Sequence, residues 1–275
     1  MIESELVSAT DIWKSIEEIA EGRAGMVYKV HANSEVYLLK IYKDSKNPQA
    51  IYQEFNIMKS ISGPYPKYYI LYEKLIYLKY DIEPHFAILS EFIEGGNLLD
   101  VIGKQLDKEK LRLLFKALAA ALYELHLLNI VHRDIKAENI ILSPERGIVI
   151  IDFDTACKED GINIEKRVGT LDYFEASLAA IYYIDDIHDM TFTQWLKADV
   201  WSLGVLFYEI AHGHLPFSKP EDEEGIVLRN IIKNEPIITE PKSDPTIRQI
   251  IKHMLEKNPQ KRISSFELYK TLSYT

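Results

Sequence analysis

Short runs of apolar residues, alternating with polar ones, fill the first ninety positions of the chain. The runs GMVYKV (25–30) and EVYLLKIYK (35–43) are separated by the turn-like sequence HANS, which predicts a β-hairpin. Two further runs, LIYLKY (75–80) and HFAILSEF (85–92), have the same strand character. The pattern therefore predicts a small, mostly antiparallel sheet in this part of the chain.

A helical period of apolar residues marks one stretch of this first part and most of the chain beyond it. The sequence AIYQEFNIMKSI comes after the breaker Asn-Pro and places Ile51, Phe55 and Met58 on one helical face. The Gly-rich sequence EGGN at 94–97 predicts a boundary near residue 94. Beyond it, helical periods cover residues 108–129, 197–213, 224–234, 244–255 and 264–272.

Composition places the chain among ordinary globular proteins. Of its 275 residues, 47% are hydrophobic and 27% are charged, which is enough apolar material for a packed core. The net charge of −10 argues against a nucleic-acid partner and against an anionic membrane surface, because both require a basic face. No apolar run approaches the roughly 18 residues of a membrane span, so we expect no membrane-spanning helix.

The single cysteine and the first residues bear on the compartment. Cys157 has no second cysteine with which to form an internal disulfide, which suits a reducing compartment. The sequence MIESELVSATDIWKSIEE is acidic where a secretory signal is basic, and no apolar segment comes after it. We expect a cytoplasmic protein, while secretion routes that use no such signal stay open.

Three features of the first part carry weak chemical signals. Gly22 and Gly25, in GRAGMVYKV, would let backbone amides approach a phosphate, although an ordinary hairpin turn also explains them. Lys40 lies within an apolar run, where a lysine is usually an edge residue with its charge in water. The alternative is a phosphate-binding lysine held by a carboxylate, and Glu54 on the predicted helix is such a carboxylate.

The sequence HRDIKAEN at 132–139 carries a stronger signal. Phosphoryl transfer needs a carboxylate beside the attacking hydroxyl and oxygen ligands that hold Mg²⁺ against the nucleotide phosphates. Asp134, Asn139 and Asp152 supply those side-chain types within twenty residues. Two apolar runs lie between Asn139 and Asp152, so strands are expected to carry the cluster.

With these motifs the chain resembles the eukaryotic-type protein kinase family, from about Ile19 to Arg262. The resemblance implies an α+β, bilobal fold formed by a single kinase domain over residues 1–275, with ATP and Mg²⁺ bound in the cleft between the lobes. The N-lobe would cover about 1–93, the hinge about 91–96 and the mostly helical C-lobe about 97–275. Oligomeric state is left open.

The same resemblance assigns roles to individual residues. Asp134 is similar to the catalytic base, Lys136 to the lysine at the γ-phosphate, and Lys40 to the lysine at the α- and β-phosphates, with Glu54 as its partner. Asn139 and Asp152 resemble the ligands of Mg²⁺, for which Mn²⁺ is an alternative. The nucleotide contacts implied by the resemblance are Gly22, Gly25, Val27, Lys40, Glu91, Ile93 and Ile141. Ser90 resembles a small gatekeeper, and Asp199 and Arg262 resemble structural anchors.

The subclass is indicated by two positions. Lys136, two residues after Asp134, and Thr170 resemble those of serine/threonine kinases, so the resemblance implies ATP-dependent phosphorylation of protein hydroxyls. Two alternatives stay open. One is a pseudokinase that binds nucleotide or partners without turnover, and the other is a kinase of small molecules.

Four departures from the family pattern support the first alternative. Ala20 replaces the first glycine of the nucleotide loop, and Leu38 replaces an alanine that touches adenine, close to Ser90. Ser177 replaces the glutamate that pairs with the arginine matched by Arg262, so that Glu175, Asp185 or Asp186 must substitute. Asp154 gives Asp-Phe-Asp in place of Asp-Phe-Gly, and aspartate is among the residues that best tolerate positive φ. We expect these changes to alter the site without disabling it.

The loop between Thr155 and Thr170 contains no Ser, Thr or Tyr. In many family members, the arginine that Arg133 resembles binds a phosphorylated residue in this loop. Glu165 lies near the position of that residue, so it could offer Arg133 a permanent carboxylate, although a solvated charge run is the simpler interpretation.

Overall fold

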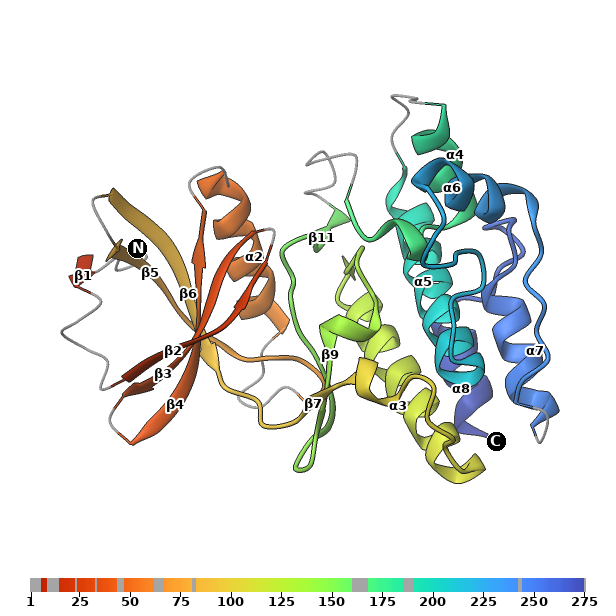
Figure 1. The fold of residues 1–275 in the computed structure, drawn as a ribbon, viewed down its shortest axis with the longest axis horizontal. Helices are drawn as coiled ribbons and strands as arrows, with labels where there is room; N and C mark the ends of the chain where they lie inside the picture. Colours follow the sequence, from red (N-terminus) through yellow and green to blue (C-terminus); the bar gives the residue numbers. More distant parts are fainter. Residues whose placement is uncertain are drawn as a thin grey trace. The chain divides into compact units, whose positions relative to one another are not determined.

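The structure is a computed structural model that describes residues 6–8, 15–22, 24–32, 34–43, 47–61, 67–80, 83–159, 168–184, 190–241 and 244–274. The chain divides into two compact units. The first contains Met1–Gly95 and Ser143–Asp154, and the second contains Gly96–Leu142 and Thr155–Thr275. Figure 1 shows the sheet of the first unit and the helices of the second, and each is described by itself.

A six-stranded sheet forms the body of the first unit. All neighbouring strands pair antiparallel except β1, which runs parallel to β5. In spatial order the strands are β1 (Leu6–Ser8), β5 (Tyr72–Tyr80), β6 (Glu83–Glu91), β4 (Glu35–Tyr42), β3 (Gly25–Ala32) and β2 (Ser15–Glu21). The predicted hairpin and the two further predicted strands are confirmed, while β1 and β2 were not predicted.

The strand period of two separates the side chains of this sheet onto two faces. One face carries an apolar cluster made by alternate residues of β3, β4, β5 and β6: Tyr28, Val30, Leu39, Ile41, Ile76, Leu78, Ala87 and Leu89. The residues between them therefore point to the opposite face. There the register aligns Val27 with Lys40, and Lys40 with Ile88.

Helix α2 (Pro48–Ile61) packs in the first unit against β5 and β6. The sequence explains its start, because Asn47 accepts a hydrogen bond from the backbone of Gln49 and Pro48 suits a first helical position. The predicted apolar face is confirmed, since Ile51, Phe55 and Met58 are all buried. Glu54 is buried with them.

The second unit is mostly helical, as its periodicity predicts. Its helices are α3 (Lys108–Leu127), α4 (Ala176–Tyr183), α5 (Phe192–His212), α6 (Glu224–Lys233), α7 (Pro245–Met254) and α8 (Ser265–Ser273). Helix α5 contacts α3, α7 and α8, and the ring of Phe207 stacks on that of Phe115 from α3 at 3.7 Å between centroids. Among the described residues, no helix has the length and apolar character needed to cross a membrane.

The predicted fold class is confirmed. One stretch that the sequence analysis assigned to the helical part lies in the first unit. Ser143–Asp154 groups with the first unit, although residues beyond 97 were assigned to the helical part. The reason lies in backbone hydrogen bonds within the first unit, because Ile150 donates to the carbonyl of Tyr68 at 2.7 Å and accepts from Ile70 at 3.2 Å. The ring of Phe153 also packs edge-on against Tyr69.

Candidate active site

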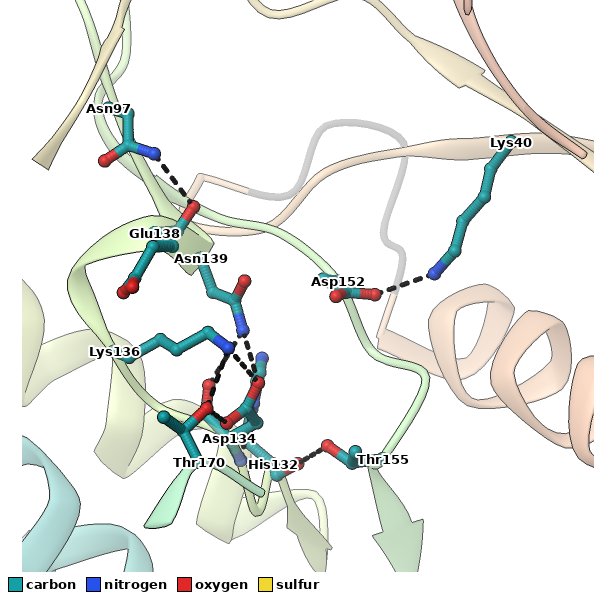
Figure 2. A network of polar contacts seen from close by, with 10 residues as sticks. All are labelled: Lys40, Asn97, His132, Asp134, Lys136, Glu138, Asn139, Asp152, Thr155 and Thr170. Carbon is teal, nitrogen blue, oxygen red and sulfur yellow. Dashed lines mark hydrogen bonds and ion pairs between the residues drawn. The ribbon is translucent and has the colours of Figure 1, made fainter. Parts of the chain in front are cut away.

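Lys40, on β4, lies among carboxylates of the first unit. Its Nζ is 2.7 Å from Oδ1 of Asp152 and 3.3 Å from Oε1 of Glu54 on α2 (the contact with Asp152 is drawn in Figure 2). Burial lowers the pKa of Lys40, but the charges of Asp152 and Glu54 outweigh it and hold that pKa well above its usual value. Lys40 therefore stays charged. It contacts its predicted partner Glu54, and it also contacts Asp152, which was predicted only as a metal ligand.

The two glycines of the predicted nucleotide loop lie at the turn between β2 and β3, because Gly22 comes directly after β2 and Gly25 begins β3. Gly22 donates its backbone N–H to the carbonyl of Gly25 at 2.8 Å. A Cβ on Gly25 would lie 2.0 Å from the carbonyl oxygen of Ile41, so this position requires glycine for the close approach of two strands. Val27 comes next on the face that carries Lys40 and is half-buried.

Polar contacts fix the predicted hinge residue Glu91 at the end of β6. Its Oε1 accepts from the backbone of Leu71 at 2.8 Å and from Nη1 of Arg146 at 2.6 Å, all within the first unit. Sequence reasoning missed Arg146, which has no counterpart in the motifs. Ile93 is buried shortly after Glu91.

Ser90 and Leu38 are directly opposite each other on β6 and β4. Ser90 is buried and Leu38 is half-buried. A small side chain therefore lies opposite the large one across the ladder.

Asp134 stands at the centre of a polar network in the second unit. Its Oδ1 accepts from the hydroxyl of Thr170 at 2.7 Å, and its Oδ2 lies 2.9 Å from Nζ of Lys136 (Figure 2). Lys136 also donates to the Thr170 hydroxyl at 2.8 Å. Nδ2 of Asn139 donates to Oδ2 of Asp134 at 3.0 Å. The structure thus joins the four residues that the motifs singled out here.

Asp199, on α5, fixes the backbone that presents Asp134. Its carboxylate accepts from the backbone N–H groups of His132 and Arg133, both at 2.8 Å, and it is 1% exposed. Arg133 has φ 67°, a conformation that such bonds can hold. The backbone of Gly169 (φ 101°) lies against that of Arg133, because a Cβ on Gly169 would be 2.6 Å from the Arg133 carbonyl oxygen. The structural role expected for Asp199 agrees with these contacts.

Glu175 supplies the carboxylate that Ser177 lacks. Its Oε2 lies 3.0 Å from Nη2 of Arg262, and both side chains are fully buried. Burial lowers the pKa of Arg262, and the charge of Glu175 opposes that shift. Of the three substitutes considered, Glu175 is therefore the one observed, while Asp185 and Asp186 lie outside the described residues.

The predicted metal ligands are hard oxygen donors, one in each unit. The amide nitrogen of Asn139 donates a hydrogen bond to Asp134, so the amide oxygen of Asn139 points away from that carboxylate (Figure 2). The Asp152 side chain is 37% exposed, and its backbone has φ 59°. An amide oxygen and a carboxylate suit Mg²⁺, which takes few protein ligands and completes its shell with water and phosphate oxygens.

Asp154 does not occupy a position that demands glycine. Among the described residues, the non-glycine positions with positive φ are Ser34, Asn129, Arg133 and Asp152, so the left-handed residue of Asp-Phe-Asp is its first aspartate. The charge of Asp154 acts on Lys40 and raises its pKa, after Asp152 and Glu54 in size. The substitution therefore changes charge without straining the backbone.

Known proteins with similar sequences agree with this geometry. The family model described as Protein kinase domain matches residues 13–272. The chain is 27% identical over 96% of its length to serine/threonine-protein kinase KIC1 of Saccharomyces cerevisiae, and 27% identical over 90% to serine/threonine-protein kinase cds1 of Schizosaccharomyces pombe. It is 30% identical over 93% to serine/threonine-protein kinase Nek6 of rice, Oryza sativa subsp. japonica. It spans 24%, 52% and 46% of these three relatives, respectively.

Proposed function

The chain belongs to the protein kinase domain family, and from that premise we propose that it transfers the γ-phosphate of ATP to serine or threonine hydroxyls of proteins. The network of Asp134, Lys136, Asn139 and Thr170 is the observation that carries this proposal. It combines a carboxylate that can accept a proton with a cation 2.9 Å from it.

Each group of the network has a distinct task. The Asp134 carboxylate orients the attacking hydroxyl and accepts its proton, while the Lys136 ammonium stabilises negative charge on the transferred phosphoryl group. Thr170 holds Asp134 through its hydroxyl, which fixes the carboxylate before the substrate arrives. Little of the binding energy is then spent on reorganisation.

In this proposal the nucleotide is bound mostly by groups of the first unit, together with Asn139 and Ile141 of the second. Lys40, kept charged by Asp152 and Glu54, holds the α- and β-phosphates. Asn139 and Asp152 would hold Mg²⁺, or Mn²⁺ in its place, and the ion would neutralise phosphate charge. Gly22, Gly25, Val27, Ile93 and Ile141, with the backbone of Glu91, would contact the nucleotide.

The chain's location and substrate class are also inferred. The single cysteine, Cys157, has no second cysteine with which to form an internal disulfide, which supports a reducing, cytoplasmic compartment. It is buried, and burial raises the pKa of its thiol. Protein substrates are favoured over small molecules because the relatives KIC1, cds1 and Nek6 are all named serine/threonine-protein kinases.

The test is phosphate transfer from γ-labelled ATP to a generic basic protein. Asp134→Asn should lower kcat at least about 100-fold, because nucleophile positioning and charge stabilisation dominate this chemistry. Glu145→Gln, which removes a charge at an exposed turn, should leave kcat unchanged. Absence of transfer by the wild type, with nucleotide binding retained, would establish a pseudokinase. Turnover on a metabolite alone would establish a small-molecule kinase.

A further inference from the structure

A tyrosine that no motif singles out reaches the Lys40–Glu54 pair. Tyr72, the first residue of β5, donates its hydroxyl to Oε1 of Glu54 at 2.9 Å. The same oxygen lies 3.3 Å from Nζ of Lys40. All three residues belong to the first unit, and the side chains of Tyr72 and Glu54 are buried.

Two donors, the Tyr72 hydroxyl and the Lys40 ammonium, lie at different distances from Oε1 of Glu54. Nζ of Lys40 lies 2.7 Å from Asp152 and 3.3 Å from Glu54, so Asp152 is the nearer of these two carboxylates. Of the contacts that Tyr72 and Lys40 make with Oε1 of Glu54, the hydrogen bond from Tyr72, at 2.9 Å, is the shorter. A buried carboxylate that loses such a donor bears a large desolvation cost, so this contact matters for the orientation of Glu54.

Tyr72 also contacts α2 at a second point. Its carbonyl accepts from Nζ of Lys59 at 3.4 Å, five residues beyond Glu54 on the same helix. The register explains how one residue reaches both, because β5 shifts register between Tyr72 and Lys74 and aligns Tyr72 with Ser90. The irregularity turns the Tyr72 side chain towards the face of the sheet that bears Lys40.

A second tyrosine completes the surroundings of the pair. Tyr42 lies two residues after Lys40 on β4, and Nζ of Lys40 is 5.2 Å from its ring centroid. Burial and the charge of Glu54 hold the pKa of both Tyr42 and Tyr72 well above the usual value. Both phenols therefore stay protonated at neutral pH, and Tyr72 remains a hydrogen-bond donor.

We propose that Tyr72 is a positioning residue of the phosphotransfer reaction, whose buried hydroxyl holds Glu54, and with it α2, in the orientation in which Glu54 directs Lys40 to the ATP phosphates. The inference rests on the proposed function. It adds that Tyr72, an unmodified side chain of the sheet, maintains this orientation of Glu54 while Lys40 binds the nucleotide phosphates.

The first test is Tyr72→Phe, which removes one hydroxyl and keeps the ring. We expect kcat/KM for ATP to fall roughly tenfold or more, the usual size for a lost hydrogen bond to a charged group, while KM for the protein substrate stays unchanged. Tyr28→Phe is the matched control, because Tyr28 is equally buried but lies in the apolar cluster on the opposite face. Its kcat/KM should remain within about twofold of wild type.

A double-mutant cycle separates positioning from a general effect on folding. If Tyr72 acts through Glu54, the double variant Glu54→Gln with Tyr72→Phe should be no slower than Glu54→Gln alone. Amide exchange in Tyr72→Phe should become faster in α2 and stay unchanged in β3 and β4. Additive losses in the cycle, or wild-type kcat/KM in Tyr72→Phe, would overturn the inference.

Lys40→Met, measured in the same assay, distinguishes the two proposals. Loss of activity in Lys40→Met together with full activity in Tyr72→Phe would overturn the role of Tyr72 and leave the kinase assignment intact. Full activity in Lys40→Met would overturn the nucleotide site and the role of Tyr72 with it.

Discussion

At the scale of single residues, a neighbour compensates for one departure from the family pattern, and two others cause no evident strain. Arg262 keeps a buried carboxylate because Glu175 takes the place that Ser177 leaves vacant. Leu38 faces the small side chain of Ser90 across the ladder. Asp154 needs no glycine-like backbone, since the positive φ belongs to Asp152. These substitutions therefore give little support to the pseudokinase alternative.

Asp154 gives a prediction at this scale. If its carboxylate helps to hold a cation beside Asp152, then Asp154→Gly should raise the Mg²⁺ concentration for half-maximal activity by about threefold, the effect of one partly exposed charge. Asp154→Asn should do the same, because it removes the charge and keeps the size. The measurement is a Mg²⁺ titration of initial rates. An unchanged or lower requirement in both variants would mean that Asp154 is only tolerated.

At the scale of elements, periodicity predicted most of the helices and the central strands. The hairpin β3–β4 and helices α2, α3 and α5 to α8 arise from alternation or a helical period that burial enforces. Helix α4 was missed because its sequence ASLAAIYY is apolar on every side, so it has no polar face to define a period. Strand β2 was missed because all seven of its residues are exposed.

The candidate site was predictable only where a motif fixes the chemistry. Asp134 and Asn139 stand in a recognisable sequence, and the structure places them in one network. The signal for Lys40 was weak until the family resemblance gave it a role. Tyr72 was not predictable, because it lies in an apolar run and a register shift in β5 decides which way it points. Local sequence does not encode such a shift, since it depends on pairing with β6.

Helix α7 provides the prediction at the element scale. Asp244 caps it by accepting from the backbone of Ile247, and its Oδ2 lies 2.6 Å from Nε of Arg112 on α3. Asp244→Ala removes both interactions and should lower the free energy of unfolding by about 2–3 kcal/mol. Chemical denaturation measures this change. Asp244→Asn, which can still cap the helix, should lose less.

The same residue makes stability depend on pH. Burial raises the pKa of Asp244, but the hydrogen bonds from Arg112 and from the backbone of Ile247 outweigh it and lower that pKa. Folding therefore favours the ionised form, so this stabilisation is present above the ordinary aspartate pKa and is lost as the pH falls through the lowered value. Melting temperatures of wild type and Asp244→Asn should accordingly converge in acid. A constant difference at all pH values would contradict the assignment.

At the scale of the whole molecule, the chain crosses between its two units three times, after Gly95, Leu142 and Asp154. The residues of the proposed reaction are divided by these crossings, with Lys40, Glu54 and Asp152 in the first unit and Asp134, Lys136 and Asn139 in the second. Each group is fixed within its own unit by contacts that involve no modified residue. Activity should therefore not depend on a phosphate in the loop that begins at Thr155.

The last prediction is that the protein needs no phosphorylation of this loop. Between Thr155 and Thr170 the sequence has no hydroxyl-bearing residue, and the Thr170 hydroxyl donates a hydrogen bond to Asp134. Nε of Arg133 donates to the carbonyl of Thr155 at 2.5 Å, and its guanidinium lies 5.3 Å from the ring centroid of Trp195. The arginine that would otherwise receive a phosphate is thus engaged within the second unit.

Phosphatase-treated protein should accordingly keep its full kcat, checked by intact mass and by the transfer assay. Glu165, which lies outside the described residues, is the predicted carboxylate partner of Arg133. On that hypothesis Glu165→Ala should lower kcat and speed amide exchange in the loop, whereas Glu145→Gln, remote from the loop in sequence, should do neither. Full activity in Glu165→Ala would show that Arg133 needs only Thr155 and Trp195. Loss of activity on phosphatase treatment would show that a phosphate elsewhere in the chain takes part in ordering the loop.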